Sequence, residues 1–115
     1  MAHIVTARCI DCRYTDCVEA CPVDCFWEIQ DPHMLVIDPD TCIDCTLCVE
    51  ECPIRAIWPE DDLPEEYAEW TDKNRDLFEG GTNITEMSGP LDGAKTLEQI
   101  HEEEEAKGWD IADPA

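Results

Sequence analysis

The nine cysteines of this 115-residue sequence are the residues best suited to chemistry, and none of them lies beyond residue 52. Four of them form the run Cys42-x2-Cys45-x2-Cys48-x3-Cys52-Pro53. Soft thiolate ligands suit iron–sulfur clusters, zinc and copper(I). Three thiols at this spacing can wrap one cubane-shaped cluster, while the fourth is directed toward a second cluster. The competing interpretation is a zinc site built from two Cys-x2-Cys pairs.

This cysteine run is one copy of an internal repeat, since residues 9–22 carry a similar pattern. Cys-Ile-Asp-Cys opens each copy and Cys-Pro closes it. A tryptophan follows the last cysteine of each copy by six residues, at Trp27 and Trp58, and we expect both rings to pack around the clusters. The repeat predicts two halves related by approximate two-fold symmetry, and two reciprocal runs of this kind disfavour zinc.

Reciprocity between the two copies assigns one complete set of ligands. If the last cysteine of each copy serves the other cluster, a [4Fe–4S] cluster receives four thiolates, from Cys21, Cys42, Cys45 and Cys48. The second cluster then has Cys52 and three candidates, Cys9, Cys12 and Cys17. Four residues separate Cys12 from Cys17, where the other copy has two, so we do not expect all three candidates to reach the cluster. Three ligands suit [3Fe–4S].

The motifs resemble those of the seven-iron bacterial ferredoxins, specifically the Azotobacter type with a long C-terminal extension. The resemblance is close over residues 9–52, including Tyr14-Thr15-Asp16-Cys17 and Cys21-Pro22-Val23-Asp24-Cys25-Phe26, and it is looser in the acidic extension. It implies an α+β fold whose core is a ferredoxin-like, pseudo-two-fold βαβ repeat that binds two clusters. It also implies the ligands of one [3Fe–4S] cluster, Cys9, Cys17 and Cys52, and of one [4Fe–4S] cluster, Cys21, Cys42, Cys45 and Cys48. Cys12 would not be a ligand.

Two further residues near these ligands could take part in the chemistry. Asp16 adjoins Cys17 and is a candidate proton carrier for the reduced [3Fe–4S] cluster; the alternative is a solvated acid or a helix cap. Cys25 has Ala56 at the equivalent position of the other copy. It is either a small buried apolar residue or a spare thiol beside the [4Fe–4S] cluster.

The expected activity is one-electron transfer, because a cluster with only protein thiolate ligands has no open position for a substrate. We expect a carrier, not an enzyme, that passes low-potential electrons between a ferredoxin reductase and acceptor oxidoreductases. The expected acceptors are oxidoreductases such as a haem monooxygenase or a nitrogenase-linked system; the resemblance supports the class of protein and does not specify the partner. The alternatives are a redox-sensing or iron-sensing regulatory protein and an electron-transfer subunit of a larger enzyme.

The formal net charge of −22 restricts the partners further. It argues against nucleic acid, whose phosphates need Lys and Arg, and against an anionic membrane surface. It favours a positively charged protein partner. The sequence opens without a basic stretch and a long apolar run, so we expect no signal peptide, reduced thiols and a cytoplasmic location. We also expect a monomer.

The chain divides into a cluster-binding core at residues 1–60 and an acidic C-terminal extension at residues 61–115 that packs on the core. Apolar and β-branched runs predict strands at 3–7, 26–29 and 34–37, the last two paired across a turn at 30–33. Single helical turns are predicted at 16–20 and 46–51, each ended by the Pro that follows.

In the extension, apolar spacing predicts a helix at about 64–78 and a weaker one at about 94–107. Within the second, residues 102–105 are four consecutive glutamates and are interpreted as a solvated face. His3, His33 and His101 are expected to face solvent and are given no metal.

Overall fold

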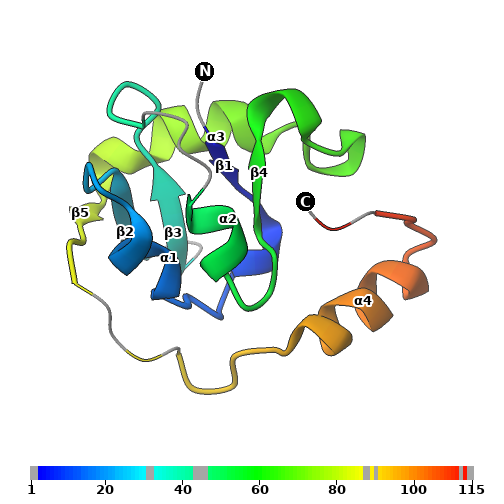
Figure 1. Ribbon diagram of the computed structural model, residues 1–115. Coiled ribbons are helices and arrows are strands. Elements are labelled where there is room, and N and C mark those ends of the chain that lie inside the picture. Colours follow the sequence, from blue (N-terminus) through cyan, green and yellow to red (C-terminus); the bar gives the residue numbers. More distant parts are fainter. Residues whose placement is uncertain are drawn as a thin grey trace.

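Short strands and helices alternate through residues 3–59 of this α+β fold, and further helices follow in the extension (Figure 1). The computed structural model describes residues 3–30, 33–42, 47–86, 89, 91–111 and 113. The strands are β1 His3–Val5, β2 Phe26–Gln30, β3 His33–Ile37, β4 Ile57–Pro59 and β5 Thr82–Asn83. The α-helices are α1 Asp16–Ala20, α2 Leu47–Glu51, α3 Trp70–Leu77 and α4 Leu97–Ala106. The 3-10 helices are η1 Ala7–Cys9, η2 Glu60–Asp62, η3 Glu65–Tyr67 and η4 Phe78–Gly80.

The strands form two small antiparallel sheets, one of β1 and β4 and the other in the order β3, β2, β5. Ile4 pairs with Trp58 in the first sheet, and Phe26 pairs with Ile37 in the second. The predicted pairing of 26–29 with 34–37 is therefore confirmed, although residues 31–32 of the predicted turn lie outside the described residues. The predicted strand at 3–7 is shorter than expected, because η1 begins at Ala7.

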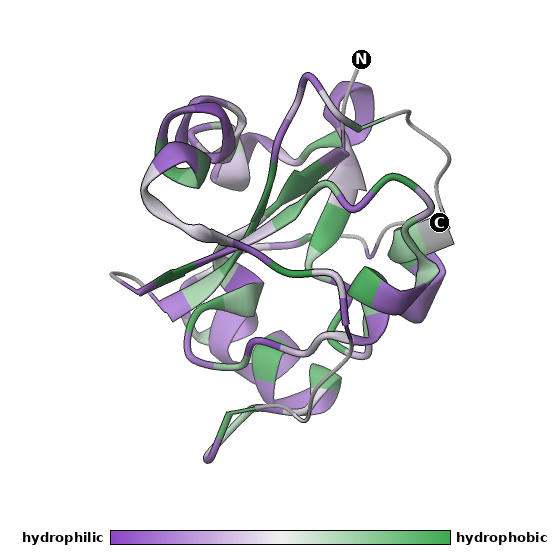
Figure 2. Cartoon of the chain, turned by 90° about the vertical axis from the view of Figure 1, so that its left-hand side faces the viewer, coloured by the Kyte–Doolittle hydropathy of each residue, from purple (hydrophilic) through white to green (hydrophobic). Residues whose placement is uncertain are grey.

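The two short helices of the core lie together in the foreground of Figure 1, where α1 packs against α2. Both were predicted from the sequence, and α1 has the predicted bounds. α2 begins at Leu47, while Thr46 lies outside the described residues. Hydrophobic residues concentrate on the strands, whereas the helices alternate between hydrophobic and hydrophilic residues (Figure 2). The core therefore lies between the strands and the apolar faces of these helices.

The helix predicted at 64–78 is wrong in extent, since only Trp70–Leu77 is α-helical. A 3-10 turn, η3, precedes it and another, η4, follows it. The tighter turn places Tyr67 between two distant rings, with centroids 5.8 Å from Trp58 and 5.6 Å from Trp109. Local spacing predicted a single longer helix because it does not indicate these contacts between segments far apart in the sequence.

Asn74 of α3 links the two sheets through its buried amide. Its Oδ1 accepts hydrogen bonds from the backbone N–H of Val5 in β1, at 3.2 Å, and of Ile37 in β3, at 2.9 Å. Its Nδ2 donates to the carbonyls of Val5 and Trp70, both at 2.8 Å. One side chain thus satisfies backbone groups of both sheets that would otherwise be buried without partners.

The second helix of the extension, α4, is slightly shorter than the predicted 94–107 and begins with a capping box. The Thr96 hydroxyl accepts from the backbone N–H of Gln99, and the Gln99 side chain accepts from the backbone N–H of Thr96. This reciprocal pair satisfies two donors at the helix start. Within the part of the chain that the structure describes, no helix is both long and apolar enough to cross a membrane.

Candidate iron–sulfur sites

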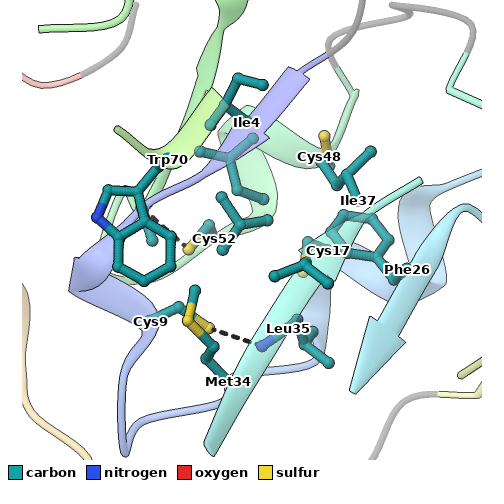
Figure 3. Close-up of a cluster of buried hydrophobic side chains, with 14 of the residues drawn as sticks. Ile4, Cys9, Cys17, Phe26, Met34, Leu35, Ile37, Cys48, Cys52 and Trp70 are labelled. Atoms are coloured by element: carbon teal, nitrogen blue, oxygen red, sulfur yellow. Dashed lines mark hydrogen bonds between the residues drawn. The ribbon is translucent and has the colours of Figure 1, made fainter. Parts of the chain in front are cut away.

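Three of the predicted ligands line one small buried cavity, whose volume is about 10 Å³. Cys9 ends η1, Cys17 lies on α1 and Cys52 directly follows α2, so three separate elements supply the thiols. Figure 3 shows Cys9, Cys17 and Cys52 among apolar side chains of the core. The rest of the lining is largely apolar, and consists of Val5, Tyr14, Leu35, Ile54, Ala56 and Ile57.

The thiols of this three-cysteine site are buried and receive backbone N–H groups. Leu35 N–H donates to Cys9 Sγ at 3.5 Å, and Ala56 N–H donates to Cys52 Sγ at 3.4 Å. Burial raises the pKa of Cys9 to about 12, and it also raises the pKa of Cys17 and Cys52. The thiolate form therefore needs a positive metal at the site, and soft ligands in an apolar cavity suit an iron–sulfur cluster.

Cys12 is also buried, but its sulfur is directed to the C-terminal segment. Its Sγ accepts from the backbone N–H of Lys95 at 3.4 Å, and its carbonyl accepts from the N–H of Leu91 at 3.0 Å. Among the described residues that line the three-cysteine cavity, Cys12 is absent.

A second group of thiols lies around Cys25. The sulfurs of Cys21 and Cys25 are 3.3 Å apart, and the backbone N–H of Cys25 donates to Cys21 Sγ at 3.5 Å. A hydrogen bond with the Cys42 thiol, together with burial, raises the pKa of Cys25. The structure thus brings Cys21 and Cys42 together and puts Cys25 in their midst, while Cys45 lies outside the described residues.

The two groups of thiols are adjacent, because each short helix contributes to both. α1 carries Cys17 and is capped by Cys21, and α2 carries Cys48 and is followed by Cys52. Residues four apart share one helix face about one turn apart. Besides burial, the charges of Cys52, Cys9 and Cys48 raise the pKa of Cys17, so thiols of both predicted sites surround it.

The other residues singled out from the sequence have mixed outcomes. Asp16 is the first residue of α1 and is partly exposed, and its charge contributes to the raised pKa of Cys52 after the larger effect of burial. Trp58 is buried in the core, and Trp27 is half-buried with its ring 5.7 Å from that of Phe78. The prediction for His3 was wrong, because this residue is only 1% exposed in β1.

Comparison with known proteins identifies the family. A model of the 4Fe-4S binding domain matches residues 35–58, which run from β3 to β4. A Rickettsia felis protein named "Ferredoxin" is 48% identical over 96 residues, 82% of this chain and 84% of the relative. A Hydrogenibacillus schlegelii protein named "Ferredoxin 7Fe" is 48% identical over 78 residues, 68% of this chain and 97% of the relative. The chain belongs to the ferredoxin family.

As a member of this family, the ferredoxin described here is an iron–sulfur electron carrier. The 4Fe-4S match includes Cys42, Cys45, Cys48 and Cys52, which form the strongest motif of the sequence. None of the eight described cysteines forms a disulfide, so their thiols remain able to act as ligands.

Sequence reasoning missed one buried ionic cluster of this ferredoxin, which is centred on Arg8. The guanidinium is bound by Glu104 at 2.6 and 2.7 Å and by Asp113 at 2.9 Å, and it lies 4.8 Å from the Trp58 ring centroid. Tyr67 also donates to Glu104. The prediction of a solvated face at 102–105 was therefore wrong for Glu104, which is 5% exposed. Nothing in the local sequence around Arg8 or Glu104 indicates this pairing, since 96 positions separate them.

Proposed function

We propose that this ferredoxin carries electrons through one [3Fe–4S] and one [4Fe–4S] cluster. Cys9, Cys17 and Cys52 would hold the first, and Cys21, Cys42, Cys45 and Cys48 the second. The single observation that carries the proposal is the cavity lined by Cys9, Cys17 and Cys52, whereas the sulfur of Cys12 accepts a hydrogen bond from Lys95. The relative named "Ferredoxin 7Fe" supports it.

We further infer that the core is a pseudo-two-fold βαβ repeat and that the chain is of the Azotobacter type with a long extension. The order β1-α1-β2 followed by β3-α2-β4, with β1 paired to β4 and β2 to β3, supports this symmetry. So do Asp24 and Arg55, which occupy equivalent repeat positions and both have positive φ, at 51° and 48°. In each copy, the residue after the one with positive φ donates its backbone N–H to the last cysteine of the run: Cys25 to Cys21 Sγ, and Ala56 to Cys52 Sγ.

When bound, such clusters supply one-electron transfer, while the protein sets their potentials through burial, charge and hydrogen bonds to sulfur. The buried cavity excludes water from the three-cysteine site. Backbone N–H groups stabilise negative charge on Cys9 and Cys52. We propose that Asp16, partly exposed beside Cys17, moves a proton between solvent and this site on reduction.

The partners proposed are a ferredoxin reductase and acceptor oxidoreductases, such as a haem monooxygenase or a nitrogenase-linked system, with basic docking surfaces. The exposed acids Glu19, Asp24 and Glu86 line a surface hollow that reaches Cys21. Opposite charge on a partner would steer it to the thiol group nearest the surface. We propose that the carrier acts as a monomer in the cytoplasm, where reduced thiols persist.

Iron analysis and EPR of protein purified without air test this assignment. We expect about seven irons per chain and the signal of an oxidised three-iron cluster. Cys17→Ala should remove that signal and leave the four-iron cluster, whereas Cys42→Ala should have the converse effect. Eight irons in the wild type would indicate a fourth ligand at the site of Cys9, Cys17 and Cys52, and would contradict the [3Fe–4S] assignment. Zinc without iron would overturn the whole proposal.

A further inference from the structure

The peptide group between Arg55 and Ala56 connects the guanidinium of Arg8 to the sulfur of Cys52. Arg8 Nη1 donates to the carbonyl of Arg55 at 3.1 Å. On the other side of the same peptide, the N–H of Ala56 donates to Cys52 Sγ at 3.4 Å. Hydrogen bonds in series polarise one another, so a cation at the carbonyl strengthens the N–H that faces the sulfur.

The C-terminal extension holds Arg8 in this position. Glu104 of α4 binds Nε and Nη2 of the guanidinium, and Asp113 binds Nη1. Arg8 and Glu104 are 4% and 5% exposed, so water screens this pair very little. These two carboxylates of the extension fix the orientation of the guanidinium, so that Nη1 also donates to the carbonyl of Arg55.

The other copy of the repeat has the same peptide with a different donor. The N–H of Cys25 donates to Cys21 Sγ at 3.5 Å, and the carbonyl of Asp24 accepts from Asn83 Nδ2 at 2.9 Å. Asn83 lies on β5, which pairs with β2. The sulfur of Cys52 thus faces a peptide polarised by a cation, whereas that of Cys21 faces a peptide polarised by a neutral amide.

We propose that Arg8 and Asn83 are positioning residues that tune the two clusters separately through these two peptides. The inference rests on the proposed function, in which Cys52 and Cys21 are ligands of different clusters. A stronger N–H···S hydrogen bond stabilises the additional negative charge of the reduced state. Arg8, held by the extension, therefore raises the reduction potential of the cluster bound by Cys52 and has little effect on the other.

The decisive variant is Arg8→Gln combined with Glu104→Gln. Arg8→Gln alone would leave Glu104 as a buried anion without its cation, which is strongly destabilising. The double substitution removes one charge of each sign, so the net charge of the protein does not change. Redox titration followed by EPR resolves the two clusters, and we expect a lower potential for the Cys52 cluster with an unchanged potential for the Cys21 cluster.

Asn83→Ala is the matched variant for the peptide that faces Cys21. It should lower the potential of the Cys21 cluster alone, and by less than the double variant lowers that of the Cys52 cluster, because the lost donor is neutral. Arg8→Lys, which keeps the charge but loses the fork of donors, is the second variant should the double variant not assemble its clusters, and it should give a smaller fall at the same cluster.

Unchanged potentials, or equal shifts of both clusters, in variants with normal iron content would overturn the tuning by Arg8 and Asn83. That result would leave the electron-carrier function intact. Iron content that does not match two clusters in the wild type would instead contradict the proposed function, so the two failures are distinguishable.

Discussion

At the scale of single residues, the cysteines differ in what their sulfurs face. Cys12 Sγ accepts a hydrogen bond from Lys95, while Cys17 faces the three-cysteine cavity. We expect Cys12→Ala to retain full iron content and an unchanged EPR signal, with a stability loss of about 1 kcal/mol from the partly buried Lys95 N–H left without its acceptor. Cys17→Ala is the control, and it should lose one cluster. Equal iron loss in both variants would show that Cys12 is a ligand and would contradict this assignment.

Asn74 is the residue on which the connection between the two sheets most depends. Asn74→Leu keeps a similar volume but leaves two backbone N–H groups and two carbonyls without their side-chain partner. Each buried group without a partner costs about 1–3 kcal/mol, so we expect a loss of at least about 3 kcal/mol. The measurement is the temperature at which the cluster absorbance is lost. Asp76→Asn, exposed on the same helix, should change stability by less than about 0.5 kcal/mol.

At the scale of elements, the approach of β5 to β2 depends on a glycine. A Cβ at Gly81 would lie 2.6 Å from the carbonyl oxygen of Glu28, whereas a Cβ at Gly80 meets nothing within 4 Å. We therefore expect Gly81→Ala to shift β5 and destabilise the protein by about 1–3 kcal/mol. Gly80→Ala is the matched control in thermal unfolding. If the two alanine variants unfold at the same temperature, the backbone of β5 can shift without cost, and the close approach of Gly81 to Glu28 does not contribute to stability.

The attachment of α4 predicts a particular dependence of stability on pH. Burial of Glu104 opposes its charged form, but hydrogen bonds from Arg8 and Tyr67 outweigh burial and lower its pKa below the ordinary 4.5. A carboxyl with a lowered pKa in the folded state contributes stability that is complete above its unfolded pKa. This stability is lost as pH falls through the folded pKa.

Denaturant unfolding between pH 6 and pH 3.5 tests this contribution. We expect Glu104→Gln to be less stable than the wild type at pH 6 and the difference to shrink toward pH 3.5. Glu105→Gln, the exposed neighbour on the same helix, should match the wild type at both pH values. A constant difference between Glu104→Gln and the wild type would show that the charge of Glu104 is not the source of the stability.

At the scale of the whole molecule, the charge of −22 governs encounters with partners. Long-range attraction to a basic reductase is screened by salt, so we expect the bimolecular rate of reduction to fall as ionic strength rises. Glu86→Lys, in the hollow beside Cys21, should slow the reaction more than Glu65→Lys on η3, which lies outside the hollow. Stopped-flow kinetics measure both rates. Equal effects of the two variants would mean that docking does not use the hollow.

Much of this ferredoxin was determined by the sequence itself, because its signals are local. Thiol spacing indicated the cluster chemistry, the Cys-Pro that follows each segment marked the ends of the two short helices, and apolar and β-branched runs on either side of a turn predicted the β2–β3 hairpin. A helix that stops before Pro22 needs only its own neighbours to be predicted, because proline cannot continue it.

Only the tertiary structure decided which way the buried side chains face. The orientation of Cys12 depends on Lys95, and the burial of Arg8 depends on Glu104. Asn74 reaches Val5 across 69 positions of the chain. Each of these contacts joins the extension to the core. Local residue spacing does not indicate them, because their energy depends on the burial of both partners together.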